Sequence, residues 1–186
     1  MTNKTTTLSV SNTEIIQQIN QLKRKLGELC AQLSIKYLQE AFHLTPLKIS
    51  SSEINVIIRK YFPTQKISHL DGKYWLLPWW QWQDLINVDW VSTKKWVAEK
   101  FDCDNFANAF ASNMAMYYEI NSAMRVYGKL YEGTEKFLDY HYWNGIITSN
   151  KEIYFLEPQS DLWTKYEGGM LLIGGNKYEV TQFILG

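Results

Sequence analysis

The feature that most constrains the fold is a change in the period of the apolar residues near residue 121. Before that point apolar residues recur every three or four positions, and one such face comprises Phe106, Phe110, Met114 and Tyr117. After it they alternate with polar residues, as in "AMRVYGKLY" and "KYEVTQFIL". Helices that precede strands predict an α+β fold, with helices packed on a C-terminal antiparallel sheet.

The individual elements can be predicted from the same patterns. We expect helices over residues 54–61, 81–87, 93–99 and 103–118, and strands over 123–131, 139–149, 151–158, 170–174 and 177–185. Residues 149–151 and 174–176 have the composition of tight hairpin turns. Residues 43–53 contain Pro46 and a run of serines, which predicts a linker. Within it, Ser50 and Glu53 have the spacing of a capping box for the helix that follows.

The N-terminal part carries a heptad pattern. Isoleucine or leucine recurs at steps that alternate between four and three residues, which is the a/d spacing of a coiled coil. The residues are Ile15, Ile19, Leu22, Leu26, Leu29 and Leu33. Two alternatives stay open, a helix docked on its own domain and a homo-oligomer formed through residues 15–33. The predicted organisation is a disordered tip at 1–12, a heptad-patterned helix at 13–42 and one domain at 43–186.

The overall composition excludes some classes of partner. The chain of 186 residues has a formal net charge of zero, which gives no indication of nucleic acid or an anionic membrane as partner. No apolar run approaches the ~20 residues that span a bilayer, and the first residues do not resemble a secretion signal. Only two cysteines are present, so we expect a reducing, cytoplasmic location, with non-classical release as an alternative.

Cys103 is the first candidate for chemistry. It lies at the predicted start of the 103–118 helix, where free N–H groups and the helix dipole favour a thiolate. Its neighbours Asp102 and Asp104 act in the opposite direction by like charge. We therefore expect a cationic group beside the sulfur, either an imidazolium or a metal ion.

His141 is the candidate base for this thiol. It lies on a predicted strand 38 residues after the cysteine, and a helix-borne cysteine followed by a strand-borne histidine suits a nucleophile–base pair. Two residues could orient the imidazole. Asn144 is three residues away and points to the other face of a regular strand, whereas Glu157 is in reach across the hairpin. Glu157 is the predicted orienter, and Asn144 is predicted to support the site.

Three motifs resemble a known family. "FDCDNFA", "HYWN" and "FLEPQ" are similar, in order and spacing, to the papain-like cysteine protease domain at the C-terminus of the Marasmius oreades agglutinin and its bacterial and phage relatives. The aromatic stretch that ends at Phe101 also resembles the segment before the cysteine in that family. The resemblance covers roughly residues 65–165 and excludes the heptads.

The resemblance implies a function and a site. It implies a papain-like cysteine peptidase with a Cys103–His141–Glu157 triad and a peptide or protein substrate. It also implies calcium dependence, with Asp104, Asn105 and Gln159 at the ligand positions. Asn105 replaces an acidic residue of the family pattern, which removes one charge from the site. Trp143 and Trp75 are predicted to border the substrate cleft.

Two other functions remain open from the sequence. A peptidoglycan amidase or endopeptidase of a related fold would use the same residues. A non-catalytic module would keep the fold for binding, with the heptad helix for oligomerisation. The reactivity of Cys103 toward alkylating agents separates the non-catalytic alternative from the two hydrolases.

Overall fold

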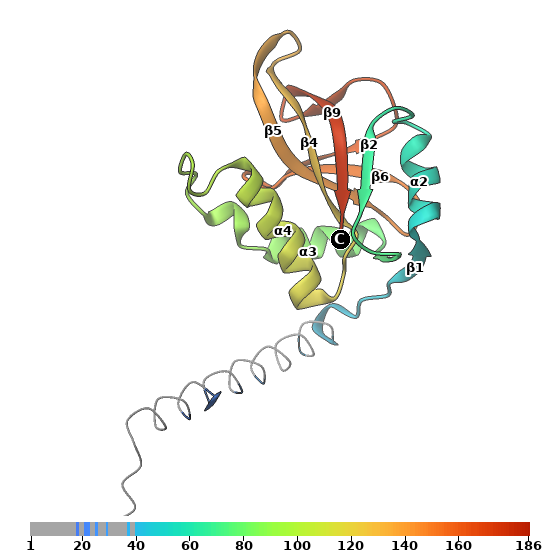
Figure 1. The fold of residues 1–186 in the computed structure, drawn as a ribbon, viewed down its shortest axis with the longest axis vertical. Coiled ribbons are helices and arrows are strands. Elements are labelled where there is room, and N and C mark those ends of the chain that lie inside the picture. Colours follow the sequence, from blue (N-terminus) through green and yellow to red (C-terminus); the bar gives the residue numbers. More distant parts are fainter. Residues whose placement is uncertain (1–17, 19–20, 23–24, 26–28, 30–36, 38–39) are drawn as a thin grey trace, which may run out of the picture.

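A computed structural model describes residues 18, 21–22, 25, 29, 37 and 40–186 of the chain (Figure 1). The main sheet has seven strands in the order β2-β9-β4-β5-β6-β7, and β8 pairs with β9 beside this path. All pairs are antiparallel except β2 with β9, which is parallel. A separate two-stranded sheet joins β1 and β3.

The helices and strands have the following bounds. The strands are β1 Leu47–Ser50, β2 Lys66–His69, β3 Lys73–Leu76, β4 Ala123–Glu132, β5 Lys136–Ile147, β6 Ile153–Glu157, β7 Leu162–Tyr166, β8 Leu171–Ile173 and β9 Asn176–Leu185. The helices are α2 Ser51–Arg59, α3 Trp79–Val88 and α4 Cys103–Tyr118, with a 3₁₀ turn at Val91–Thr93.

Helix α2 shows how local sequence sets the start of an element. Ser50 is its N-cap and accepts the backbone N–H of Glu53, and Glu53 accepts the N–H of Ser50 at 2.8 Å in return. This reciprocal pair satisfies two backbone donors at the helix start. The apolar side chains Ile54, Ile57 and Ile58 then lie on one buried face. The cap and the helical period were both predicted from the sequence, and both are confirmed.

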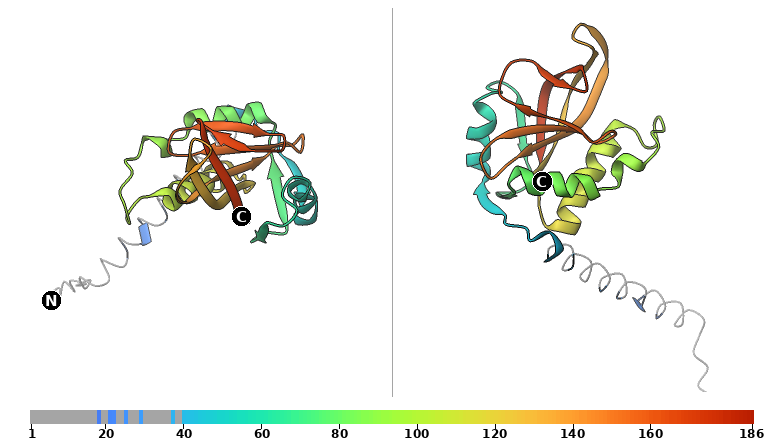
Figure 2. Two further views of the ribbon diagram at one scale, coloured as in Figure 1. Left: turned by 90° about the horizontal axis from the view of Figure 1, so that it is seen from above. Right: turned by 180° about the vertical axis from the view of Figure 1, so that it is seen from behind.

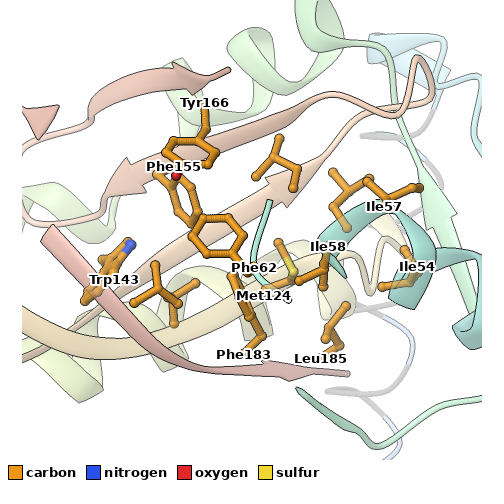
Figure 3. Packing of buried hydrophobic residues seen from close by; sticks show 14 of the residues in the cluster. Ile54, Ile57, Ile58, Phe62, Met124, Trp143, Phe155, Tyr166, Phe183 and Leu185 are labelled. Atoms are coloured by element: carbon orange, nitrogen blue, oxygen red, sulfur yellow. The ribbon is translucent and has the colours of Figure 1, made fainter. Parts of the chain in front are cut away.

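Both faces of the sheet are covered (Figure 2). On one face, α2 packs on a core that contains Met124, Trp143, Phe155 and Phe183 (Figure 3). On the other face, α3 and α4 pack on a second core around strands β5 and β6. Alternate residues of β6 enter the two cores, so the whole strand is buried.

The N-terminal predictions fall largely outside the described residues. The disordered tip at 1–12 lies outside them entirely, and so do Ile15, Ile19, Leu26 and Leu33 of the heptad pattern. Leu22 and Leu29 are described, and both side chains are largely exposed. The oligomer through residues 15–33 and the domain boundaries therefore stay predictions. Among the described residues, no helix is both long enough and apolar enough to cross a bilayer.

The predicted fold class is corrected by this architecture. We expected an α+β papain-like fold in which N-terminal helices and a central Cys103-bearing helix pack on a C-terminal antiparallel sheet. In the part of the chain that the structure describes, strand predominates over helix. A strand from the N-terminal half, β2, also joins the main sheet in parallel with β9. The sequence therefore does not divide into helices followed by a sheet.

Some predicted elements differ from the structure for physical reasons. The linker at 43–53 contains β1 and the start of α2, and the short strands β2 and β7 were not predicted. The helix expected at 93–99 is absent, since residues 93–100 are exposed and Val97 instead forms a bridge with Phe101. A seven-residue helix with no buried face is not stable. The helix at 103–118 forms with the predicted bounds.

Candidate reactive-thiol site

Cys103 is the first residue of α4 and is partly exposed. Asp102 precedes it as the N-cap, and its backbone N–H donates to the side-chain oxygen of Asn105 at 3.2 Å. The Asp102 carboxylate also accepts the N–H of Glu99 at 3.2 Å. One of the two aspartates beside the thiol therefore serves to begin the helix, which holds the sulfur at the positive end of the helix dipole.

His141 and Glu157 form the core of the site. His141 Nε2 lies 2.6 Å from Glu157 Oε2, and the two residues are each only 8% exposed. Strands β5 and β6 pair so that Asn144 lies opposite Leu156, which brings Glu157 at the end of β6 close to His141 in the middle of β5. The sequence predicted that Glu157 is in reach of His141, and this contact is confirmed. Their functional roles stay predictions.

The protonation of His141 links it to the thiol. Burial disfavours the charged imidazolium, but its hydrogen bonds to Cys103 and Glu157, and the charges of both, outweigh burial and raise the pKa of His141 to about 9. Because Nε2 is engaged by Glu157, Nδ1 is the ring nitrogen left for Cys103. The imidazolium of His141 is thus the cationic group that we expected beside the sulfur, because the two neighbouring aspartates disfavour a thiolate.

Glu157 has two further donors that the sequence did not reveal. The Tyr178 hydroxyl on β9 donates to Glu157 Oε2 at 3.0 Å, and the backbone N–H of Gln159 donates to Oε1 at 3.3 Å. Tyr178 could be placed on the buried face of its strand by alternation alone. Its contact with Glu157 depends on the order of strands in the sheet, which the sequence does not show.

Trp143 lies against the histidine. Its ring is stacked on His141 with centroids 6.1 Å apart and meets the Tyr178 ring edge-on at 5.0 Å. The side chain is fully buried, so it forms the wall of the site. Gly128 on β4 lies opposite His141 in the sheet, and a Cβ there would clash with the Glu179 backbone and approach the Trp143 ring to 2.9 Å.

Asn144 and Trp75 lie apart from the thiol. The Asn144 amide donates to the carbonyl oxygens of Ala107 at 3.0 Å and Met124 at 3.1 Å, so it ties α4 to the sheet. Trp75 on β3 lines a different cavity of about 320 Å³, whose other walls are Leu44, Pro46, Tyr118, Glu119 and Ile120. The contacts of Asn144 agree with the supporting role predicted for it, whereas Trp75 borders a cavity other than the thiol site. The roles of Trp75 and Trp143 at a substrate cleft stay predictions.

The predicted calcium ligands are only partly available. Hydrogen bonding to Asp102, followed by burial and the Asp102 charge, raises the pKa of Asp104, so these two carboxyl groups are close neighbours. The Asn105 oxygen is engaged in the helix cap. Among the described residues there is no group of three acidic, histidine or cysteine side chains that could hold a metal ion. The three predicted ligands alone supply fewer oxygens than the six to eight that surround a calcium ion. Calcium binding stays a prediction.

The histidines provide a test of this electrostatic arrangement. We expect His141 to remain protonated at pH 7.5 and to titrate near pH 9, whereas burial lowers the pKa of His69. Because the folded pKa of His141 is raised, its contribution to stability is complete below about pH 6.5 and is lost as the pH rises through about 9. NMR titration of the imidazole C–H signals measures both values. Titration of both residues together near pH 6.5 would contradict the arrangement.

Comparison with solved structures places the fold among structures of a lectin. No family model matches the chain, and no curated protein matches it. One matching structure is described as the PSL1a-E64 complex, with 17% identity and a TM-score of 0.54 over 74% of this chain and 51% of that chain. Another is Polyporus squamosus lectin bound to the human-type influenza-binding epitope Neu5Aca2-6Galb1-4GlcNAc, with 18% identity and a TM-score of 0.51 over 74% of this chain and 49% of that chain.

These findings correct the family and activity predictions. One of the two structures is named as a lectin, and neither is named as a papain-like cysteine protease of the Marasmius oreades agglutinin type. They likewise correct the prediction of a cysteine-type hydrolase acting on peptides, because the fold is shared with the structure of a lectin bound to a saccharide. The chain spans about half the length of each of these neighbours. A binding function is the remaining alternative from the sequence.

Proposed function

We propose that the protein is a ligand-binding module that captures an electrophilic ligand at Cys103. The single observation that carries this proposal is the His141–Glu157 contact of 2.6 Å beside the thiol. A partly exposed cysteine next to a buried imidazole that favours the protonated form has the surroundings of a reactive thiol. A buried cysteine with a purely structural role would not need this pair.

The chemistry of capture follows from the geometry. An imidazolium at His141 favours the thiolate form of Cys103, and the sulfur forms a bond to an electrophilic carbon of the ligand. The bond from that carbon to its leaving group, or to the oxygen of a strained ring, breaks at the same time. His141 supplies a proton to the departing oxygen where one is formed. Glu157 holds the ring in place and stabilises its positive charge.

The test is covalent labelling of the intact chain. We expect iodoacetamide to modify Cys103 at pH 5.5 much faster than it modifies a cysteine-containing peptide, because an ordinary thiol is only about 0.1% thiolate at that pH. E64, the compound named with one neighbour, is a second probe. Mass spectrometry of digested protein separates Cys103 from Cys30, which lies outside the described residues. The reaction should be measured with calcium and with a chelator.

The outcome that would overturn the proposal is equally clear. If Cys103 reacts no faster than the peptide thiol at pH 5.5, with and without calcium, the site is not a reactive thiol. Faster labelling of Cys30 than of Cys103 would lead to the same conclusion. A reducing location such as the cytoplasm belongs to the proposal, since capture requires a free sulfur.

A second candidate, binding of a saccharide, is favoured by a row of aromatic side chains on β4 and β5. Tyr127 lies between Tyr140 and Tyr142, with ring centroids 5.7 and 4.8 Å away, and Tyr131 contacts Phe137 further along the hairpin. Aromatic faces with nearby polar groups are typical of ligand sites. Titration with the Neu5Ac-containing trisaccharide tests this candidate on a Cys103→Ser variant, in which capture is impossible. Absence of binding at millimolar concentration would exclude this saccharide as the ligand.

A further inference from the structure

We propose that Tyr178 is a positioning residue of the thiol site, which acts through Glu157 and rests on the proposed function of Cys103. Its hydroxyl donates to Oε2 of Glu157 at 3.0 Å, the same oxygen that lies 2.6 Å from His141 Nε2. Nothing in the sequence motifs indicated this residue. It comes from β9, a strand that carries none of the three predicted site residues.

The surroundings of Glu157 show why a third group is needed. The carboxylate is buried, and a buried charge is costly unless its oxygens are hydrogen-bonded. His141 approaches from β5, Tyr178 from β9 and the Gln159 N–H from the chain that follows β6. These three donors hold the carboxylate in one orientation.

Tyr178 is itself held in a fixed place. Its side chain is buried in the α2-side core, and its ring meets His141 with centroids 5.9 Å apart as well as the edge of Trp143. Burial and the charge of Glu157 raise its pKa far above the ordinary tyrosine value. Tyr178 therefore acts only as a hydrogen-bond donor in the accessible pH range, and it does not exchange protons with the site.

The charged groups around the pair are few. Glu157 faces His141 and Tyr178, and His141 faces Cys103 at the start of α4, near Asp102 and Asp104. The next residue of β9, Glu179, belongs to the opposite face of the strand, where it pairs with Lys129 at 3.2 Å and accepts from Tyr131 at 2.9 Å. Tyr178 is thus the group on β9 through which this strand acts on the carboxylate.

The test removes the hydroxyl and nothing else. The rate at which Cys103 is alkylated falls at low pH, and we call this part of the rate–pH profile the acid limb. In Tyr178→Phe we expect the acid limb to shift to higher pH by about one unit, since one hydrogen bond to a charged group is lost. Without the hydroxyl, the Glu157 carboxylate is held less firmly against the His141 imidazolium and stabilises it less well. The His141 Nε2–H proton signal should also shift in the NMR spectrum, because the acceptor oxygen has lost its second donor.

Two further variants test whether the effect of Tyr178→Phe comes from the lost hydrogen bond or only from disturbed packing. Tyr166→Phe removes another buried hydroxyl, one that donates to Gly169 at 2.9 Å, and it should change neither the acid limb nor the NMR signal. Replacement of Tyr178 by 3-fluorotyrosine keeps the side chain and strengthens the donor, so the limb should move to lower pH. This second variant preserves the packing even where Tyr178→Phe lowers stability.

The outcomes separate this inference from the proposed function. If wild-type Cys103 is reactive but both Tyr178 variants keep the wild-type profile and NMR signal, Tyr178 is only a packing residue and the inference is overturned. If wild-type Cys103 is unreactive while the His141 signal shifts in Tyr178→Phe, the positioning role stands and the proposed capture fails. The NMR measurement needs no thiol reactivity, so it decides the inference by itself.

Discussion

Replacing His141 with alanine is expected to lower the alkylation rate of Cys103 at pH 5.5 by about 10- to 100-fold. Without the imidazolium, the sulfur at the start of α4 has only the helix dipole to favour a thiolate, and Asp102 and Asp104 oppose it. At this pH an ordinary thiol is almost fully protonated, so the loss is far larger than at pH 8. Stopped-flow or mass-spectrometric rates with iodoacetamide measure the effect.

A milder variant tests the same pair by changing the carboxylate instead of the imidazole. Glu157→Gln keeps the size of the side chain and the hydrogen bond to Tyr178, but removes the charge that holds His141 protonated. We expect a smaller fall, of about tenfold, together with a lower pKa of His141. Circular dichroism establishes that each variant is folded. Equal rates for wild type and both variants at pH 5.5 would mean that Cys103 does not depend on this pair.

Gly128→Ala is expected to destabilise the fold by about 2–4 kcal/mol, which lowers Tm by roughly 10 °C. Gly128 lies at an irregularity in the pairing of β4 with β9, where the added Cβ would clash with the backbone of Glu179. A backbone atom in a central strand cannot move away as the end of a long side chain can. Because Gly128 also lies opposite His141, alkylation of Cys103 should slow as well.

The matched control is Gly72→Ala, in the turn between β2 and β3. Among the described residues a Cβ at Gly72 would meet no heavy atom within 4 Å apart from its chain neighbours. The expected change in the free energy of unfolding is within about 0.5 kcal/mol. Thermal unfolding of both variants gives the comparison. Equal melting temperatures for the two variants would show that the strand adjusts to the extra methyl group.

Much of the local structure was available from the sequence, because local signals determine it. The capping pair Ser50–Glu53 and the apolar period after Cys103 set the starts of α2 and α4. Period-2 alternation located the long strands, and the hairpin near Asn150 placed Glu157 within reach of His141. These features depend on neighbours along the chain, and sequence patterns report such neighbours directly.

The features that the sequence did not reveal depend on contacts between distant segments. Strand β2 has only four residues, and its partner β9 lies more than a hundred residues later. No local pattern connects the two. The same holds for Tyr178, whose contact with Glu157 depends on the order of strands in the sheet. The family resemblance was carried by three short motifs, and short motifs define a constellation of side chains rather than the function of a whole protein.

The position of β9 in the sheet has a consequence for the order of folding. Of the strands in the main sheet it is the last in chain order, yet it lies between β2 and β4 and supplies the third member of the thiol's supporting network. The middle of the sheet cannot form until β9 has paired on both sides, and pairing between segments so far apart in the sequence is slow. The imidazole therefore acquires its full set of partners only after this long-range pairing. A folding intermediate in which β9 is unpaired would lack the hydrogen bond from Tyr178, and the full reactivity of the thiol would arise late in folding.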